Sequence, residues 1–346
     1  MDYEYDYLVF IGRFQPVHFG HIKIIEEALK RARNVLVCIG SANSGRTLRN
    51  PFTFQERVSL IQAYPQFRKV CVEQGRLQFL AIDDHTYADQ DWMKQIQTKV
   101  GERIDEEAEV GLIGCSKDNS TYYLKLFPQW NSVDIPVVGD LNSTAIRQKL
   151  FTEDHIDFKE CPKEVNEEML RIINKDYHGA QAIHNLTAEY EWVQKYKKLW
   201  AGTPYPVIFN TVDAVVIQSG HILLVRRKAY PGKGLWALPG GYINPDENLE
   251  QSMLRELKEE TKIQVDDWTI RECTKKSETF ADPNRSPRGR VITHAFLVKL
   301  PDKTRLPKVK GSDDAEKAKW VPLADIRMDQ MFEDHGHIIR KMTAGL

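Results

Sequence analysis

The sequence predicts an α/β protein with two domains: a doubly wound domain around a parallel sheet, followed by a smaller mixed α+β domain. Its 346 residues exceed the length of a typical single domain. Strand-like and helix-like segments alternate from Tyr7 to Leu150, which is typical of a parallel sheet. The Gly- and Pro-containing segment 202–206 then precedes a region of strands around one strongly amphipathic helix.

The elements of the first domain follow one another as strand, helix and strand. The apolar run Tyr7–Ile11 predicts a strand, residues 22–33 have helical periodicity, and residues 34–40 predict a second strand. A strand, a helix and a strand within about 40 residues form a βαβ unit, which implies parallel pairing. The remaining predicted elements are a helix at 54–63, a strand at 77–82, a helix at 91–100, a strand at 110–115 and a helix at 143–150.

Residues 151–206 are charged, helical in pattern and poor in β-branched runs. The strongest helix predictions here are Glu164–Ile173 and Ala188–Trp200, which we interpret as a tail of the first domain and a connector. We therefore expect a first domain over 1–185, a linker helix over 186–204 and a second domain over 205–346.

The second domain begins with two strands, Val212–Ile217 and Ile222–Val225, which Ser219-Gly220 joins as a hairpin. A loop rich in Gly and Pro precedes the amphipathic helix Leu249–Glu260. The later predicted elements are strands at Val265–Ile270 and Val291–Leu300 and a short helix at Leu323–Met328.

Charge and composition limit the class of partner. The net charge is −1 and the isoelectric point is near 6.8, which argues against a nucleic-acid-binding surface. The five cysteines form no C-x-x-C pair, which indicates reduced thiols. The acidic N-terminus does not resemble a signal peptide, and no apolar run approaches the roughly 18 residues of a membrane span. We expect a cytoplasmic protein without nucleic-acid or membrane partners.

Residues 12–21, GRFQPVHFGH, lie where the first strand meets the first helix. Ligands of open α/β sheets bind at the carboxyl ends of strands, and helix N-termini favour phosphates. Gly20 allows a nucleotide to approach the backbone closely. His18 and His21 face the same way on a helical turn, and Arg13 adds a forked positive charge. We predict that these groups stabilise charge growing on an α-phosphate as pyrophosphate leaves.

This segment resembles the H-x-G-H signature of the nucleotidyltransferase superfamily, and GRFQPxHxGH resembles its nicotinamide mononucleotide adenylyltransferases in particular. Two further matches, residues 41–53 and 142–147, follow in the order of that family. The resemblance covers about residues 5–150. It implies a Rossmann-like fold and formation of NAD and pyrophosphate from nicotinamide mononucleotide and ATP, with Mg²⁺ bridging the ATP phosphates. The alternative is another phosphate acceptor, such as phosphopantetheine.

The resemblance also implies roles for single residues. Arg46 and Arg147 match phosphate-binding arginines, and Arg147 takes a catalytic role together with Arg13 and the histidines. Trp92 resembles the aromatic residue that stacks on nicotinamide, although a core Trp on an amphipathic helix is the alternative. Asp83 and Asp84, at a strand end, are either metal or ribose ligands or solvated loop acids. The other expected substrate-binding positions are Gly12, Phe14, Asn142, Ser143 and Thr144.

A second site is predicted on the helix of the second domain. Glu256, Glu259 and Glu260 are spaced i, i+3, i+4, so their carboxylates crowd one helical face and repel one another. Divalent cations relieve this repulsion, and hard oxygen ligands suit Mg²⁺ or Mn²⁺. The opposite face repeats an apolar residue at every fourth position, which directs it to the core: Leu249, Met253 and Leu257.

The run from Gly241 resembles the Nudix box, G-x5-E-x7-R-E-U-x-E-E-x-G-U, in which U is aliphatic. The resemblance implies an α/β/α fold, a pairing of Glu247 with Arg255, and a metal-dependent hydrolysis of a nucleoside diphosphate linked to another group, with Glu260 catalytic. The last glycine of the box is Lys262 here. If that residue is left-handed, its side chain costs roughly 1 kcal/mol.

The substrate of the second site is predicted from two basic segments. Arg226 and Arg227 follow the hairpin as candidate phosphate contacts, with plain surface arginines as the alternative. Residues 283–290, with Arg288, resemble the D-P-R-x-R loop of Nudix proteins that act on ADP-ribose. This resemblance implies hydrolysis of ADP-ribose to AMP and ribose 5-phosphate.

The order of the domains resembles the bifunctional nicotinamide mononucleotide adenylyltransferase/Nudix hydrolases of bacteria. The alternative for the second domain is a non-catalytic sensor of ADP-ribose or NAD. Sensors of that kind carry a helical DNA-binding domain after the Nudix fold, and this chain ends at Leu346, so we expect an enzyme. The oligomeric state stays open, and a homo-oligomer is one of the alternatives.

Overall fold

A computed structural model describes residues 3–72, 74–115, 126–136, 143–152, 181–312 and 315–346. The chain divides into two compact units, Met1–Thr187 and Ala188–Leu346, called here the first and the second unit. In these described ranges, no helix has both the length and the apolar character needed to cross a bilayer.

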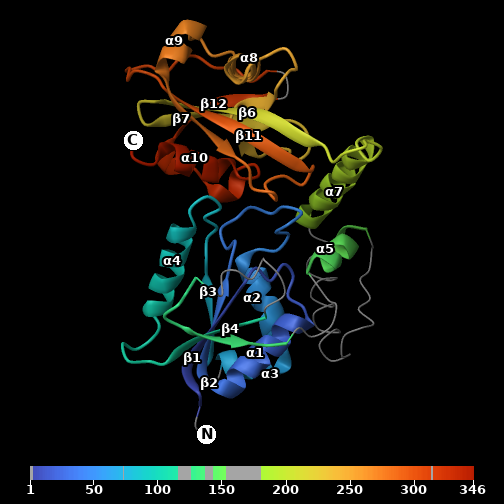
Figure 1. Cartoon of the computed structure of the whole chain (residues 1–346), viewed down its shortest axis with the longest axis vertical. Coiled ribbons are helices and arrows are strands. Elements are labelled where there is room, and N and C mark those ends of the chain that lie inside the picture. The colour runs from blue at the N-terminus through green and yellow to red at the C-terminus, as the bar shows by residue number, and fades with distance from the viewer. Residues whose placement is uncertain (1–2, 73, 116–125, 137–142, 153–180, 313–314) are drawn as a thin grey trace. The chain divides into compact units, whose positions relative to one another are not determined.

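The first unit is built on a parallel sheet in the order β3-β2-β1-β4-β5 (Figure 1). Its central strand, β1, pairs in parallel with β2 on one side and β4 on the other, so the chain reverses its direction across the sheet at β1. This order confirms the doubly wound fold class. The strands are β1 (Tyr5–Gly12), β2 (Ala32–Ile39), β3 (Leu77–Ala81), β4 (Val110–Gly114) and β5 (Asn131–Asp134).

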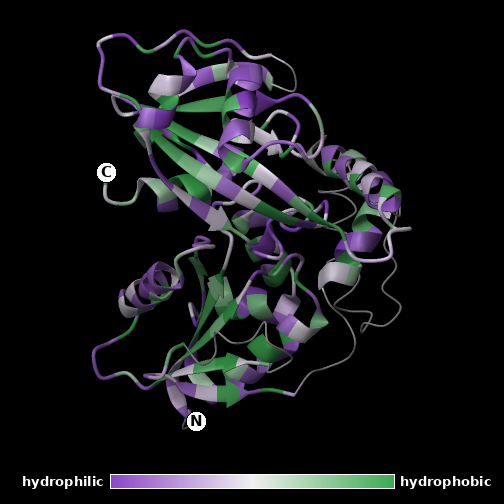
Figure 2. Ribbon diagram, turned by 45° about the horizontal axis from the view of Figure 1, so that its top comes forward, coloured by the Kyte–Doolittle hydropathy of each residue, from purple (hydrophilic) through white to green (hydrophobic). Residues whose placement is uncertain are grey.

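Helices lie on both sides of this sheet, with α4 on one side and α1 to α3 on the other (Figure 1). Val9 and Ile11 of β1 pack with Ile96 and Val100 of α4, because alternate residues of a strand face opposite sides. The strands are accordingly hydrophobic and the helices carry hydrophilic faces (Figure 2). The helices are α1 (Phe19–Arg31), α2 (Phe54–Gln62), α3 (Pro65–Val72), α4 (Asp89–Gly101) and α5 (Ser143–Thr152).

The second unit contains a mixed sheet in the order β10-β11-β6-β7-β12, with β8 on β7 and β9 on β6. β6 and β11 pair in parallel, whereas β10 with β11, β6 with β7 and β7 with β12 pair antiparallel. The strands are β6 (Ile208–Gln218), β7 (His221–Arg227), β8 (Trp236–Ala237), β9 (Gly240–Tyr242), β10 (Thr274–Phe280), β11 (Arg290–Lys299) and β12 (Ala315–Pro322).

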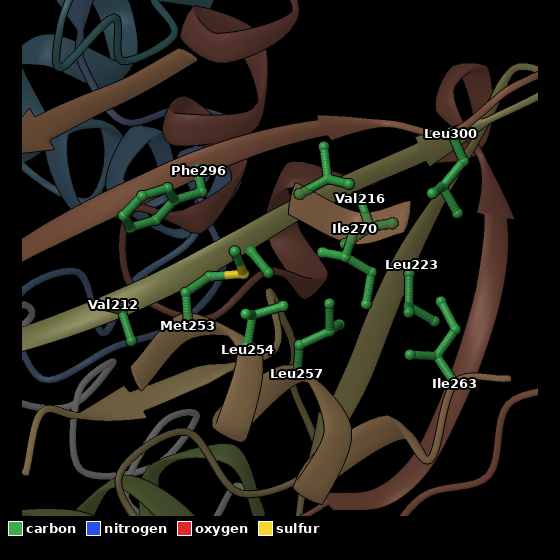
Figure 3. Close-up of a cluster of buried hydrophobic side chains, with 12 residues drawn as sticks. Val212, Val216, Leu223, Met253, Leu254, Leu257, Ile263, Ile270, Phe296 and Leu300 are labelled. Carbon is green, nitrogen blue, oxygen red and sulfur yellow. The ribbon is translucent and has the colours of Figure 1, made fainter. Parts of the chain in front are cut away.

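The helix α8 (Leu249–Thr261) covers one face of this sheet, and α10 (His335–Thr343) lies on the other (Figure 1). Met253, Leu254 and Leu257 of α8 point at Val216 and Phe296 of the strands (Figure 3). This arrangement confirms the α/β/α fold class of the second domain. The helix α7 (Gln181–Leu199) precedes β6 and overlaps the predicted connector helix.

Several predicted elements differ from the structure. The strand predicted at Val265–Ile270 is wrong, because Asp266 caps helix α9 (Asp267–Cys273) by accepting the backbone N–H of Thr269 at 2.9 Å. The predicted late helix is two 3₁₀ turns, Leu323–Asp325 and Met328–Gln330. The predicted helix Glu164–Ile173 and the residue Asn142 lie outside the described residues.

Candidate active sites

The two histidines of the first motif form the N-terminal cap of α1. Nδ1 of His18 accepts the backbone N–H of Gly20, and Nδ1 of His21 accepts the backbone N–H of His18, each at 3.2 Å. Their rings stack with centroids 3.8 Å apart, so they share one face. Because both Nδ1 atoms accept hydrogen bonds, each neutral ring carries its proton on Nε2, which is therefore a donor.

A buried aromatic ring supports the loop before these histidines. Phe14 is 1% exposed, has a left-handed backbone at φ 53°, and lies 4.8 Å from the ring of His21. A Cβ atom at Gly12 would lie 3.0 Å from the Phe14 ring, so glycine permits this packing. Gly12 and Phe14 therefore support the loop that carries the histidines and do not extend from it.

The start of α5 contacts the same loop from a distant part of the sequence. Ser143 Oγ donates to the carbonyl oxygen of Pro16 at 3.1 Å, and Arg147 Nη1 donates to that of Gln15 at 2.6 Å. Arg147 Nη2 also donates to Thr144 Oγ1 at 3.0 Å. The residues matched to the two nucleotidyltransferase motifs thus meet at the carboxyl edge of the sheet.

Positive charge concentrates around this edge. The pKa of Arg13 falls to about 10, chiefly through burial and next through the positive charges of Arg49 and Arg147. The pKa of Arg147 falls to about 10 as well, through burial and the charge of Arg49. The exposed Arg49 was missed in the sequence, although it lies in the same loop as Arg46. Mutually repelling arginines of this kind suit a polyanion such as a triphosphate.

Arg46 itself is engaged within the protein. Its Nη1 lies 2.8 Å from Oε2 of Glu56 and its Nη2 lies 2.5 Å from Oε1, a bidentate ion pair. Nη1 also donates to the carbonyl oxygen of Pro51 at 2.6 Å. These bonds make Arg46 a brace between its loop and α2.

Trp92 has the neighbours expected of a core residue, and Asp84 is engaged by hydrogen bonds within the protein rather than solvated. Trp92 is partly buried on α4, packs against the core, and lies 6.0 Å from the ring of Phe127. The carboxylate of Asp84 accepts hydrogen bonds from Ser41 Oγ at 2.9 Å and Ser44 Oγ at 3.0 Å. Asp84 therefore holds the loop that follows β2.

In the second unit, the Nudix-type spacing becomes a locked loop. Arg255 Nε donates to both carboxylate oxygens of Glu247, at 2.8 and 3.0 Å, and Arg255 Nη2 donates to the carbonyl oxygen of Tyr242 at 3.0 Å. A Cβ atom at Gly241 would lie 2.5 Å from the carboxylate of Glu256. Glycine is therefore required for the close approach of loop and helix.

Protein donors hold the three carboxylates of α8 that belong to the predicted metal site. Arg255 Nη1 donates to Glu256 at 2.8 Å and to Glu259 at 3.1 Å, and the backbone N–H of Gly240 donates to Glu260 at 3.0 Å. Burial is the main cause that raises the pKa of Glu260 to about 8, and it raises the pKa of Glu256 too. Buried carboxylates that ionise with difficulty, and that offer oxygen ligands, fit a divalent cation.

A buried polar network below this loop was missed in the sequence. Thr293 Oγ1 donates to Asp213 Oδ2 at 2.5 Å, and the backbone N–H of Leu238 donates to Nδ1 of His335 at 3.0 Å. Nε2 of His335 lies 4.0 Å from Asp213 Oδ1, and burial lowers the pKa of His335. The network ties α10 and the sheet to the segment that leads into Gly240. Its members are scattered in sequence and show no shared periodicity.

Two of the candidate arginines of the second unit, Arg288 and Arg226, differ in their surroundings. Arg288 is nearly buried and contacts Ser286 Oγ at 3.0 Å, Tyr242 Oη at 3.3 Å and the Glu333 carboxylate at 3.4 Å. Arg226 is more exposed and donates to the carbonyl oxygen of Gly234 at 3.1 Å. Arg288 is therefore fixed in place, and Arg226 lies at the surface.

The neighbouring Arg227 interacts electrostatically with a carboxylate of α8. It lies 4.0 Å above the Phe332 ring, and its charge lowers the pKa of Glu260. A further acidic cluster, Glu333, Asp334 and His335, has ligand atoms within 4.8 Å of one another. Its atoms are already bonded, since Arg285 pairs with both oxygens of Asp334 at 2.8 and 2.9 Å.

Lys262 stands where the Nudix box has its last glycine, and it ends α8 in the left-handed conformation. Its backbone angles are φ 47° and ψ 33°, and its N–H donates to the carbonyl oxygen of Lys258 at 2.9 Å. The helix terminus is thus kept at the cost of a left-handed lysine.

Two family models match the chain in the order of the two units. A cytidylyltransferase-like model matches residues 9–149, and a NUDIX domain model matches residues 208–342. A nicotinamide/nicotinic acid mononucleotide adenylyltransferase from Acinetobacter baylyi is 41% identical over 150 residues, 43% of this chain and 77% of that protein. An ADP-ribose pyrophosphatase from Methanocaldococcus jannaschii is 33% identical over 129 residues, 37% of this chain and 69% of that protein.

One solved structure matches both units together. It is a bifunctional NMN adenylyltransferase/ADP-ribose pyrophosphatase from Francisella tularensis, in complex with AMP and a Mn ion. The match has a TM-score of 0.90 and 34% identity, and it covers 98% of each chain. With both domain models in the same order, the chain belongs to the family of bifunctional NMN adenylyltransferases/ADP-ribose pyrophosphatases.

Proposed function

We propose that the chain is a bifunctional enzyme of NAD metabolism. Its first unit forms NAD and pyrophosphate from nicotinamide mononucleotide and ATP, and its second unit hydrolyses ADP-ribose to AMP and ribose 5-phosphate. The observation that carries this proposal is that each family's charged motif lies assembled on its own unit. Support comes from the relatives named for these two activities.

In the first unit, the phosphate of nicotinamide mononucleotide attacks the α-phosphate of ATP in line. Nε2–H of His18 and of His21 donates to the α-phosphate oxygens, where negative charge grows in the transition state. Arg13, Arg147 and Arg49 hold the β- and γ-phosphates and stabilise the leaving pyrophosphate. Catalysis is then positioning and electrostatics, without a covalent intermediate.

Arg46 and Trp92 keep their proposed contacts with phosphate and nicotinamide only if they rearrange or add to the bonds described above. We therefore assign Arg49 as the phosphate-binding arginine of this loop and Arg46 as its brace. Gly12, Phe14, Gly20, Ser143 and Thr144 shape the loop and the helix ends around the substrate phosphates.

In the second unit, Glu256, Glu259 and Glu260 hold divalent metal, Mg²⁺ or Mn²⁺. When bound, the metal polarises the pyrophosphate and lowers the pKa of water. Glu247 and Arg255 fix the loop that carries Gly240 against α8, so that the Glu260 carboxylate keeps one orientation. We assign Arg288, Arg227 and the more exposed Arg226 to the diphosphate, and support for Arg227 is that its charge lowers the pKa of Glu260.

Mass analysis of products tests both halves. The whole protein with ATP, a divalent metal and nicotinamide mononucleotide should yield NAD and pyrophosphate, and with ADP-ribose it should yield AMP and ribose 5-phosphate. Phosphopantetheine and nicotinic acid mononucleotide serve as competing acceptors in the first assay. A faster reaction with phosphopantetheine than with nicotinamide mononucleotide would reject the assigned acceptor.

A non-catalytic sensor is the second candidate for the second unit. An ADPR responsive transcriptional repressor from Acinetobacter baylyi is 28% identical over 158 residues, 44% of this chain and 58% of that protein. The left-handed Lys262 in the box also departs from the hydrolase pattern. Tight binding of ADP-ribose without AMP release, at saturating Mg²⁺ and Mn²⁺, would identify the sensor.

A further inference from the structure

A buried arginine of the first unit takes no part in the steps above. Arg57, on α2, is 0% exposed, and its guanidinium donates hydrogen bonds to main-chain carbonyl oxygens. Its Nε donates to Thr53 at 3.1 Å, its Nη1 to Arg13 at 2.7 Å and to Gly40 at 2.6 Å, and its Nη2 to Ser41 at 3.0 Å. A single planar guanidinium thus binds four carbonyl groups.

These carbonyls belong to the segments that form the phosphate site. Arg13 lies in the loop between β1 and α1, and Gly40 and Ser41 follow β2. In a parallel sheet these loops leave neighbouring strands at the same edge, so their relative position depends on contacts between them. Arg57 supplies such a contact, because Nη1 bonds both loops at once.

One of the bound residues has a conformation that needs support. Ser41 is a non-glycine residue at φ 51°, in the left-handed region. Its carbonyl oxygen accepts from Arg57 and its hydroxyl donates to Asp84 at 2.9 Å. A disfavoured backbone of this kind persists where the surroundings fix it, and such places cluster at functional sites.

The charge of Arg57 also acts on the site. It lowers the pKa of Arg13, together with Arg49 and Arg147, so it contributes to the positive field at the carboxyl edge. Its guanidinium is covered by the protein, which leaves this field and the loop geometry as its routes of action.

We propose that Arg57 is a positioning residue of the adenylyl transfer, which fixes the loop of Arg13 and His18 against the loop after β2. The inference rests on the proposed function of the first unit. A shift of about 1 Å in groups that hold reacting phosphates costs on the order of a hundredfold in rate. Arg57 is therefore expected to influence ATP turnover without touching ATP.

The test compares Arg57→Lys with a matched control, Arg76→Lys. Lysine keeps the charge but lacks the planar fork, so it cannot bridge the two loops in the same geometry. Arg76 donates to the carbonyl oxygens of Leu29, Ala32 and Arg33 at 2.9, 3.0 and 2.7 Å, at the amino end of β2. It repeats the chemistry of Arg57 at the opposite edge of the same sheet.

In the full chain, Arg57→Lys is expected to raise KM for ATP and to lower kcat/KM for ATP by about a hundredfold. Arg76→Lys should leave KM for ATP unchanged, and ADP-ribose hydrolysis should be unchanged in both variants. KM does not depend on the fraction of folded enzyme, so this readout separates positioning from stability. Arg57→Gln is the second variant, and it should show at least as large a rise in KM.

Three outcomes would overturn the proposal. The first is an unchanged KM for ATP in folded Arg57→Lys, even if the apparent kcat falls in proportion to the folded fraction. The second is an equal effect of Arg76→Lys. The third is that neither Arg57 variant is soluble while Arg76→Lys is, which would assign Arg57 to folding. If the unsubstituted protein forms no NAD, the proposed function fails and the inference fails with it. If the unsubstituted protein forms NAD and one of the three outcomes is found, the inference about Arg57 fails alone.

Discussion

Nδ1 of His21 accepts the backbone N–H of His18 at 3.2 Å, so the histidine pair that we propose for catalysis is also the cap of its own helix. The two tasks would use different ring nitrogens, because Nδ1 caps the helix and Nε2 carries the proton that would be donated. Substitutions that keep one nitrogen position and remove the other therefore separate stability from catalysis.

His18→Asn makes this separation. The side-chain oxygen of Asn can take the place of Nδ1 and accept the N–H of Gly20, and Asn is a favourable cap. The donor at Nε2 is lost, so kcat for NAD synthesis should fall by about 10²–10³-fold, as for removal of an oxyanion donor. The melting temperature should stay near that of the unsubstituted protein. A large loss of stability with normal kcat would show that the cap is the main role.

Arg49 and Arg46 provide a second contrast. Arg49→Ala should raise KM for ATP by about tenfold, the worth of a charge-assisted hydrogen bond. It should leave stability unchanged, because Arg49 is exposed. Arg46→Ala should instead lower the melting temperature, since it leaves Glu56 without its bidentate partner. Steady-state kinetics and thermal unfolding of both variants check this, and the reverse pattern would restore Arg46 as the phosphate ligand.

This contrast also marks the limit of the sequence. The shared face of His18 and His21, and that of the box carboxylates, could be predicted because the members of each set lie within a few residues of one another on one helix. Arg46, unlike Arg49 of the same loop, is engaged by Glu56 of α2, and no local pattern shows that pairing. The network of Asp213, Thr293 and His335 was missed for the same reason.

The errors in secondary structure have local physical causes. The apolar residues Val265, Trp268 and Ile270 favour a strand, but the side chain of Asp266 caps a helix there. β10 is largely exposed and polar, and β12 carries the exposed charged residues Glu316, Lys317 and Lys319, so the hydrophobic alternation of both strands is weak. Pairing with β11 and with β7 supplies their stability instead.

Glu260→Gln is expected to lower ADP-ribose hydrolysis by about a hundredfold or more, because metal stabilisation of the transition state is worth several kcal/mol. NAD synthesis should survive, since the first unit keeps its own site. Glu250→Gln is the matched control: it lies on the same helix, is more exposed, and pairs with Arg271 at 2.7 Å. Hydrolysis that is equally affected in both variants, or in neither, would reject the metal assignment.

The raised pKa of Glu260 predicts how pH acts on the metal-free protein. Burial raises this pKa from 4.5 to about 8, so between these values the folded state binds a proton that the unfolded state has lost. The contribution of protonated Glu260 to the stability of the folded state is therefore fully present below pH 4.5 and is lost as pH rises towards 8. Melting temperatures of the unsubstituted protein and Glu260→Gln, with chelator present, should diverge in favour of Gln as pH rises through this window. Added Mn²⁺ should raise the melting temperature of the unsubstituted protein only, and parallel curves would contradict the burial of an ionisable Glu260.

Lys262→Gly tests whether the departure from the Nudix box is a matter of backbone strain alone. Lys262 has φ 47°, where a Cβ atom costs about 1–2 kcal/mol, and glycine loses about 0.4–1 kcal/mol of that gain through its freer unfolded chain. The expected net stabilisation is about 0.5–1 kcal/mol, or a few degrees in melting temperature.

Lys262→Ala separates the two features that Lys262→Gly removes, the side-chain charge and the Cβ atom. Alanine keeps the strain because it keeps Cβ, so it should not stabilise the protein. The backbone bond from Lys262 N–H to Lys258 is available to all three residues, which leaves the helix end in place. Hydrolysis of ADP-ribose should therefore be the same in the three proteins, because no carboxylate of α8 is altered. If Lys262→Gly instead turned a silent second unit into an active hydrolase, Lys262 would be a determinant of the sensor state.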